Sequence, residues 1–361
     1  MTQPPPEVPP TLWGLVSRPS PSGHEHEAAA WLVTRMQALG FTQAYLDEVG
    51  NAIGVMGTGP REIVLLGHID TVPGHVPVRV ETDAQGRRVL YGRGSVDAKG
   101  PLAAFVDAVA GLGPRAGWRL TVIAAVDEER DSVGARHVVP RHRPEYAIIG
   151  EPSRWSRVTL GYKGTAWARV RVEIALAHTA AQAPSACEIA ADLWQQVRAW
   201  VAAENAGQAA MFDQLQVTLR DWASGTDGLH EWAEMRLGAR LPLAWPPERW
   251  YSALKERLAN APGATVTPEG YAIPAYLADR RTPLVRAFLR AIRAQGARPG
   301  LVRKSGTADL NIVAPAWGCP AVAYGPGDAA LDHTPHEHLP LDEYARAVTV
   351  LRAVLEALTT A

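Results

Sequence analysis

The segment LTVIAAVDEERDSVGAR, residues 120–136, contains the feature that most constrains the fold. An uninterrupted apolar run, residues 120–126, leads directly into three carboxylates, Asp127, Glu128 and Glu129. Such a run is typical of a strand that is buried on both faces. Carboxylates crowded at the end of a buried strand repel each other and lose hydration, so basic side chains, protonation or a bound cation must compensate their charge.

Strands and helices alternate over the first 150 residues. The segments REIVLLGH and EYAIIGEPS are also short apolar stretches that end in polar residues, as central strands do. The segments HEHEAAAWLVTRMQALG and KGPLAAFVDAVAGLG have helical spacing, with Gly40 expected as a C-cap and Pro101 in a first turn. This pattern predicts an α/β domain with a central sheet flanked by helices.

The pattern changes near residue 159. Between residues 166 and 176 apolar and polar side chains alternate, as in a half-buried antiparallel strand. The order β-α-β-β-α-β then continues to about residue 270, after which the α/β character returns with TPLVRAFLRAIRAQG and CPAVAYG. We therefore predict a discontinuous α/β domain, residues 1–158 and 271–361, and an inserted α+β ferredoxin-like domain, residues 159–270.

Composition limits the possible functions. The net charge of −1 over 361 residues gives no sign of nucleic-acid binding, and no apolar stretch approaches the roughly 20 residues that span a membrane. The N-terminus, MTQPPPEVPP, lacks a signal-peptide pattern, so a cytoplasmic protein is expected. The two cysteines, Cys187 and Cys319, are far apart and no CxxC occurs, which argues against a disulfide framework and a thiolate zinc site.

Possible metal ligands follow the predicted central strands, and functional residues of open α/β sheets gather at the carboxyl ends of strands. His68 and Asp70 come after one strand, and Glu128 and Glu129 come after another. A set of histidines and carboxylates without cysteine suits Zn²⁺, Co²⁺ or Mn²⁺, so a cation is the compensation we favour. The remaining candidates are Glu151 after a third strand, Asp97 in a glycine-flanked loop, and His333, His336 and His338 after the last strand.

Each of these signals has an ordinary structural explanation when it is taken alone. An HxD pair is more often structural, two glutamates after a strand usually lie in a solvated loop, and clustered histidines near a C-terminus are often exposed. Their joint occurrence at successive strand ends is what indicates a metal centre. A serine hydrolase is another class to consider, but no GxSxG motif occurs and Ser95 lies in the loop of Asp97.

Six motifs occur in an order that resembles a known family: GHIDTVPG, GRGSVDAKG, DEERDSVGAR, GEPS, SGTAD and DHTPHE. They resemble the two-zinc aminoacylase and carboxypeptidase family over essentially the whole chain. The resemblance implies a metallopeptidase-type central sheet with an inserted dimerisation domain, and a zinc- or cobalt-dependent amidohydrolase with two divalent ions, Zn²⁺ being expected and Co²⁺ the alternative. The implied ligands are His68, Asp97 as the bridge, Glu129, Glu151 and His333.

The resemblance also implies roles for residues beside the ligands. Glu128 is expected to be the general base, because its neighbour Glu129 is used on the metal. Asp70 is expected to orient a ligand, as carboxylates beside metal-bound histidines do. His336 and His338 are expected to have no metal role. Glu337, between them, is expected to be structural.

Two residues of the inserted domain acquire roles from the resemblance. His178 is expected to reach the active site of the partner subunit and stabilise the oxyanion, which implies a homodimer formed through the insert. The segment AHTAAQAP lacks the glycine usually found before this histidine. Arg240 matches a family arginine that holds a substrate carboxylate. The alternatives are an isolated surface histidine and a solvated arginine.

Within the family, GEPSRWSRVTLGYKG and the compact length most resemble hydrolases of lysine and arginine biosynthesis. These enzymes release lysine or ornithine from the γ-carboxyl of the C-terminal glutamate of a small acidic amino-group carrier protein. Arg240 and Lys304 are candidates for binding the α-carboxylate, Asp309 for the side-chain ammonium, and Lys163 either for the carrier or as a solvated turn lysine. The alternative is a deacylase of N-acetylornithine or N-succinyl-diaminopimelate, and a non-catalytic receptor is the rival of another class.

An acidic carrier requires a positive surface. We expect some of the arginines after the catalytic strand and on the first strand of the insert to form a positive rim around the site. Ordinary mixing of surface charge is the alternative. The arginines are Arg136, Arg141, Arg143, Arg169 and Arg171.

Overall fold

The computed structural model describes residues 5–360. Residues 1–4, which belong to the N-terminal segment that lacks a signal pattern, and residue 361 lie outside the described part. The chain divides into two compact units, which we describe separately. The first unit contains the residues up to Gly161, Ala278–Arg303 and the residues from Ala308 onward, and the second contains Tyr162–Leu277 and Lys304–Thr307.

The main sheet of the first unit is parallel at its centre. Strands β6 (Trp118–Ala125), β3 (Arg61–His68), β7 (Tyr146–Gly150) and β15 (Ala321–Ala323) lie side by side and parallel. Antiparallel strands extend both edges, with β2 (Ala52–Met56) and β1 (Gln43–Leu46) beyond β6 and with β8 (Arg157–Tyr162) beyond β15. Strand β14 (Gly300–Lys304) also pairs with β8. The carboxyl ends of β6, β3 and β7 therefore meet at one edge of the sheet.

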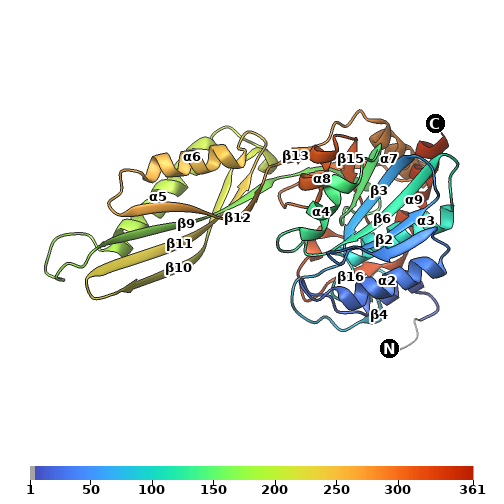
Figure 1. Cartoon of the computed structure of the whole chain (residues 1–361), viewed down its shortest axis with the longest axis horizontal. Coiled ribbons are helices and arrows are strands. Elements are labelled where there is room, and N and C mark those ends of the chain that lie inside the picture. The colour runs from blue at the N-terminus through green and yellow to red at the C-terminus, as the bar shows by residue number, and fades with distance from the viewer. Residues whose placement is uncertain (1–4, 361) are drawn as a thin grey trace. The chain divides into compact units, whose positions relative to one another are not determined.

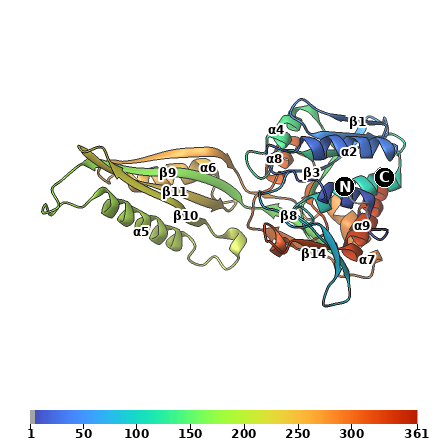
Figure 2. The same ribbon diagram turned by 90° about the horizontal axis from the view of Figure 1, so that it is seen from below.

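Helices cover both faces of this sheet (Figures 1 and 2). One face carries α2 (His26–Ala38), α4 (Val133–Val138) and α8 (Leu310–Trp317). The other face carries α1 (Pro10–Val16), α3 (Lys99–Leu112), α7 (Pro283–Ala294) and α9 (Leu341–Thr360). Of these, α3 packs directly against β3, β6 and β7. A small antiparallel sheet, β16 (His338–Pro340), β5 (Arg88–Tyr91) and β4 (Arg79–Thr82), completes the unit.

The second unit is a four-stranded antiparallel sheet with two helices. The strands lie in the order β10 (Gln216–Thr226), β11 (His230–Leu241), β9 (Gly164–Ala175) and β12 (Ala264–Ile273). Helices α5 (Ala186–Glu204) and α6 (Pro247–Leu258) pack on one face of the sheet. The short strand β13 (Tyr276–Leu277) follows β12. Along β9, Ala166, Ala168, Val170 and Val172 are buried and alternate with polar side chains, as the sequence pattern predicts.

Tryptophans fill the core of the second unit. Trp250 is fully buried and stacks on Trp200, with ring centroids 5.3 Å apart, while Trp245 meets Trp200 edge to face. A capping box at Ser185 and Glu188 begins α5. The α/β fold with a ferredoxin-like α+β portion is the fold class predicted from the sequence, and it is confirmed. No helix within residues 5–360 is long and apolar enough to cross a membrane.

Candidate metal centre

Two groups of histidine and carboxylate donors lie at the carboxyl edge of the central strands. One group contains Asp97, Glu129 and His333, and the other contains His68, Glu128 and Glu129; within each group the donor atoms lie within 4.8 Å of one another. His68 ends β3, and the two glutamates follow β6. Side chains predicted as ligands from separate motifs are therefore brought together, among them Glu129 and His333, which are 204 residues apart along the chain.

Asp97 lies between the two histidines. One carboxylate oxygen, Oδ1, is 3.2 Å from His68 Nε2, and the other, Oδ2, is 3.0 Å from His333 Nε2. His333 Nε2 is also 2.9 Å from Glu129 Oε1. A carboxylate that presents one oxygen to each of two donor groups has the arrangement that a bridging ligand needs. The peptide bond that follows Asp97 is cis.

Glu337 and Arg93 hold the loop of Asp97. The Glu337 carboxylate accepts hydrogen bonds from the backbone N–H groups of Val96 and Asp97, at 2.9 and 3.1 Å, and pairs with Arg93 at 2.8 Å. Glu337 is fully buried, and its burial raises its pKa. The residue expected to be structural thus connects the loop of Asp97 to the segment that carries His333.

Asp70 connects two strand ends. Its carboxylate accepts hydrogen bonds from the backbone N–H groups of Glu128 and Glu129, both at 3.1 Å, and from the Ser22 hydroxyl at 2.7 Å. Its backbone carbonyl accepts from His68 Nδ1 at 3.0 Å, which leaves Nε2 to face Asp97. Asp70 therefore fixes the orientation of one histidine and the position of both glutamates.

A strained turn carries the acidic residues after β6. Asp127 and Ser132 have positive φ angles of 66° and 51°, a conformation that is uncommon outside glycine. Asn51, fully buried, accepts a hydrogen bond from the Val126 N–H and donates to the Gly134 carbonyl, so it ties the two ends of the turn together. The sequence analysis missed Asn51, because its partners lie 75 and 83 residues away.

The carboxylates around His68 and His333 favour the protonated forms of both histidines. Burial opposes charge on both His68 and Asp97, yet their hydrogen bonds raise the pKa of His68 well above its usual value and hold that of Asp97 far below it. Hydrogen bonds to Asp97 and Glu129 raise the pKa of His333 to about 10. A potential that stabilises protonated histidine at this level also stabilises a bound cation, which releases these protons when it binds.

The Glu128 carboxylate lies near other carboxylates. Its burial, reinforced by the charges of Glu151, Asp309 and Glu129, raises its pKa well above the usual value against the opposing charge of His68. A carboxyl group with a raised pKa is suited to accept and return a proton near neutral pH. Glu151, 8% exposed, lies outside both donor groups, although its charge acts on Glu128.

The donor set fits divalent transition ions. Imidazole nitrogens and carboxylate oxygens, with no thiolate, suit Zn²⁺, Co²⁺ or Mn²⁺. Hydrogen bonds with Asp70 and Glu337 orient His68 and the Asp97 loop. A third group, Asp47, Glu48 and His137, lies elsewhere at the surface. There the Asp47 carboxylate already accepts three backbone N–H groups and the Asn51 amide, so it stabilises a turn.

Three predicted residues lie in the second unit and are partly or fully solvent-exposed. His178 lies in the exposed loop between β9 and α5, where its Nδ1 accepts a hydrogen bond from Ala180 N–H at 3.1 Å. Arg240, near the end of β11, donates to the Thr307 hydroxyl at 3.0 Å. Lys304 Nζ lies 5.6 Å from the centroid of the Tyr162 ring.

Lys163 and Asp309 are buried. The Lys163 ammonium donates to the carbonyls of Met211 and Gln214 and to Gln216 Oε1, and an ammonium held in this way is not available to a protein partner. The Asp309 carboxylate is 1% exposed, and neither oxygen has a hydrogen-bond partner within the described residues. Burial raises its pKa to about 6 although the nearby Ser132 hydroxyl lowers it.

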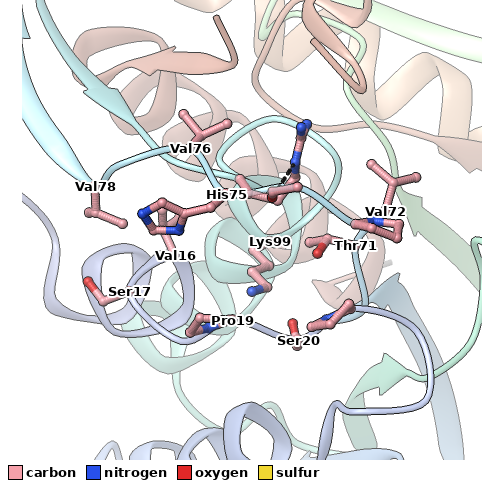
Figure 3. A pocket seen from close by; sticks show the side chains of 14 residues that line it. Val16, Ser17, Pro19, Ser20, Thr71, Val72, His75, Val76, Val78 and Lys99 are labelled. Atoms are coloured by element: carbon pink, nitrogen blue, oxygen red, sulfur yellow. Dashed lines mark hydrogen bonds between the residues drawn. The ribbon is translucent and has the colours of Figure 1, made fainter. Parts of the chain in front are cut away.

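A cavity of about 300 Å³ is lined by the loops that follow β3 and precede α3 (Figure 3). Apolar side chains, among them Val16, Val76 and Val78, form much of its wall, and the Lys99 side chain reaches into it. The Lys99 ammonium donates to the Arg18 carbonyl at 2.6 Å, and its burial lowers its pKa to about 7. This hydrogen bond ties the start of α3, two residues after Asp97, to the segment that follows α1.

The fold and the donor groups define the class of metal-dependent hydrolases built on an α/β sheet. Residues 64–357 match the family described as "Peptidase family M20/M25/M40", and the chain belongs to this family. The chain is 47% identical over 349 residues to the "[LysW]-lysine hydrolase" of Deinococcus radiodurans, a match that covers 95% of this chain and 94% of that protein. It is 29% identical to the "[LysW]-lysine/[LysW]-ornithine hydrolase" of Saccharolobus islandicus, with 82% of each chain covered.

Solved structures share the fold. A metallo-carboxypeptidase from Sulfolobus solfataricus has a TM-score of 0.76 at 17% identity, covering 97% of this chain and 99% of that chain. A tripeptidase from Staphylococcus aureus has a TM-score of 0.78 at 18% identity, covering 97% of each chain. The predicted family and the predicted amidohydrolase activity class are confirmed by these comparisons, and the names of the relatives agree with the predicted function.

Proposed function

We propose that this protein hydrolyses the amide between the γ-carboxyl of a carrier protein's C-terminal glutamate and the α-amino group of lysine or ornithine. The placement of Asp97 between His68 and His333 is the observation that supports hydrolysis at a two-ion centre. The names of the relatives, at up to 47% identity over nearly the whole chain, support the carrier-linked substrate. The reaction would release a free amino acid in lysine or arginine biosynthesis, in the cytoplasm.

The proposed ligands are those derived from the sequence motifs, with zinc or cobalt as the ions. Ions held by these residues would supply Lewis-acid chemistry for the amide carbonyl and would lower the pKa of water. Glu128 removes a proton from the attacking water and returns it to the departing α-amino group, and its raised pKa suits both transfers. The proposed ligands are His68, Asp97, Glu129, Glu151 and His333.

Substrate groups require charged partners. Arg240 and Lys304 are our candidates for the α-carboxylate of the released amino acid. Asp309 is the candidate for its side-chain ammonium, because a carboxylate that is 1% exposed, with no hydrogen-bond partner among residues 5–360, is stabilised by a cation. Asp309→Asn is expected to raise KM for the lysine-bearing substrate by about tenfold or more, and unchanged KM would remove this residue from the binding site.

The decisive assay uses carrier-linked lysine, carrier-linked ornithine and free N-acetylornithine. We expect turnover of a carrier-linked substrate, its loss after exhaustive chelation and its recovery with Zn²⁺ or Co²⁺. Glu128→Gln is expected to reduce kcat by about 10²–10⁴ while elemental analysis still finds metal in the protein. Turnover of N-acetylornithine alone would instead favour the deacylase.

We further propose a homodimer formed through the second unit, in which His178 completes the site of the partner subunit. The long strand β10 at the edge of its sheet supports this proposal, since an edge strand offers unpaired backbone groups. In that site His178 would donate a hydrogen bond to the carbonyl oxygen as its negative charge develops.

Mixing two inactive variants tests the exchange of His178. A heterodimer of Glu128→Gln and His178→Ala subunits contains one site with both native residues if the histidine acts in the partner. Activity should therefore appear when the two inactive proteins are mixed and allowed to exchange. If the mixture stays inactive although mass spectrometry detects the heterodimer, the histidine does not act across the interface.

A further inference from the structure

The rim of arginines predicted from the sequence does not supply much uncompensated charge on the second unit. Arg169 pairs with Glu234 and Glu269, and Arg171 pairs with Glu173. On the first unit, Arg141 and Arg143 donate to backbone carbonyls of their own segment. The acidic partners therefore neutralise Arg169 and Arg171, whereas a hydrogen bond to a carbonyl leaves the positive charge of Arg143 in place.

Several arginines that form no ion pair within the described residues lie around Trp155. Arg346 of α9 lies over the Trp155 ring, 4.7 Å from its centroid, and Arg157 begins β8 two residues later. Arg157 packs over Gly300, where an added Cβ would lie 3.1 Å from its Cγ. Arg298 precedes this glycine by two residues.

Helix α7 extends the same surface. The Gln295 amide, just after α7, donates to the Arg346 carbonyl at 3.0 Å, which joins the end of α7 to α9. Arg293 lies in the last turn of α7, and Arg290 and Arg286 precede it at helical spacing on the exposed face. We name Arg157, Arg293, Arg298 and Arg346 the Trp155 patch.

The Trp155 patch carries four exposed guanidinium groups, and none of them forms an ion pair within the described part of the chain. Two neighbouring carboxylates are already engaged. Asp328 pairs with Arg154, and Glu343 is buried and accepts the Trp155 and Gly327 N–H groups. Asp342, one turn before Arg346, is exposed but forms no ion pair with it.

The patch lies close along the backbone to Glu151, one of the proposed metal ligands. Trp155 follows Glu151 by four residues, which limits the separation of their Cα atoms to about 14 Å. The Arg154 N–H also donates to the Gly327 carbonyl at 2.9 Å, so the segment that leads to His333 passes beside the patch. A protein bound here could place its own C-terminal residue at the metal centre.

We propose that the Trp155 patch is the docking surface for an acidic protein whose C-terminal residue enters the metal centre. The inference rests on the proposed function, and it locates the partner's binding surface. Uncompensated arginines attract carboxylates over a distance that salt screens, so they raise the association rate and the apparent affinity of an acidic partner.

The test compares charge-reversal variants on two substrates. Arg157→Glu, Arg298→Glu, Arg346→Glu and the triple variant are assayed with the carrier-linked lysine and with γ-glutamyl-lysine, a small amide that carries no acidic protein. For the triple variant, the ratio of kcat/KM on the carrier substrate to that on the small amide should fall about tenfold or more. The matched control is Arg352→Glu, an exposed arginine of the same helix that lies beside Gly111 of α3.

Direct binding provides a second measurement. The dissociation constant of the fluorescently labelled, unloaded carrier is determined at low and high salt. It should rise steeply with salt for the wild-type protein and for Arg352→Glu, and should be higher and flatter for the triple variant. Circular dichroism reports whether each variant is folded, and the single variants replace the triple variant if it is not.

The outcomes separate the two proposals. If the wild-type protein does not cleave the carrier substrate, the proposed function fails. If it does, but the variants keep the wild-type ratio and dissociation constant, the patch does not bind the carrier. The affinity of the same variants for a single-stranded oligonucleotide is also measured. If this is the only affinity that they lose, the patch is a nucleic-acid surface and the inference is overturned.

Discussion

Glu62, at the start of the strand that ends in His68, offers a quantitative test of how the sheet under the site is stabilised. Its carboxylate is 2% exposed and accepts hydrogen bonds from the Thr121 hydroxyl at 2.8 Å and from Arg119 at 3.3 Å. The His142 ring lies 3.0 Å from the same carboxylate. Burial raises the pKa of Glu62, but these partners outweigh it and lower the pKa from 4.5 to about 2.

The shift sets both the size and the sign of the effect. This lowering of the Glu62 pKa from 4.5 to about 2 corresponds to about 3 kcal/mol of stability. Because the folded protein binds this proton less tightly than the unfolded chain, the contribution is fully present above pH 4.5. It is lost as the pH falls toward 2. Glu62→Gln retains an acceptor for Thr121 but loses the charge, so we expect it to lower the free energy of unfolding by about 2–3 kcal/mol at pH 7.

Urea unfolding of the wild-type protein and of Glu62→Gln at pH 7, 5 and 3.5 measures this difference. The difference between the two free energies should stay constant from pH 7 to 5 and shrink at pH 3.5. Glu145→Gln is the control, because Glu145 pairs with Arg61 at the exposed surface, where solvent screens the interaction, and its removal should have little effect. A difference below about 0.5 kcal/mol at pH 7, or one that grows on acidification, would refute the reasoning.

Three further predictions follow from buried contacts. Asn51→Ala frees the turn after β6 and should lower metal affinity or kcat/KM by about 10–100-fold, measured by metal titration and steady-state assay, with near-native circular dichroism. Trp250→Ala should cost about 3–5 kcal/mol in urea unfolding. Trp250→Phe should cost clearly less, because it keeps an aromatic ring and removes an indole N–H that has no hydrogen-bond partner among residues 5–360. The exposed Cys187 should react rapidly with Ellman's reagent at pH 8, while the partly buried Cys319, whose pKa burial raises to about 11, should react much more slowly until the protein is denatured.

The fold and the donor residues were predictable because their signals are local. An apolar run that ends in carboxylates is visible within ten residues, and alternation along β9 identifies its buried face. The residues that hold the donors were not predictable in this way. Glu337 meets Val96 across 241 residues, and Asn51 meets Val126 across 75, and neither partner is marked by any local pattern.

The same contrast between local signals and distant partners applies to the charge of the surface arginines. Arg169 has exposed strand spacing, which predicted a free charge, but its acidic partners belong to strands 65 and 100 residues away and neutralise it. A helix carries Arg286, Arg290 and Arg293 at helical spacing, and the only acidic residue near them in the sequence is Asp279. The positive charge on this exposed face was therefore predictable from the sequence of one segment. Surface charge is thus predictable from sequence where a single element supplies it, and it requires the structure where neighbouring strands supply the counter-charge.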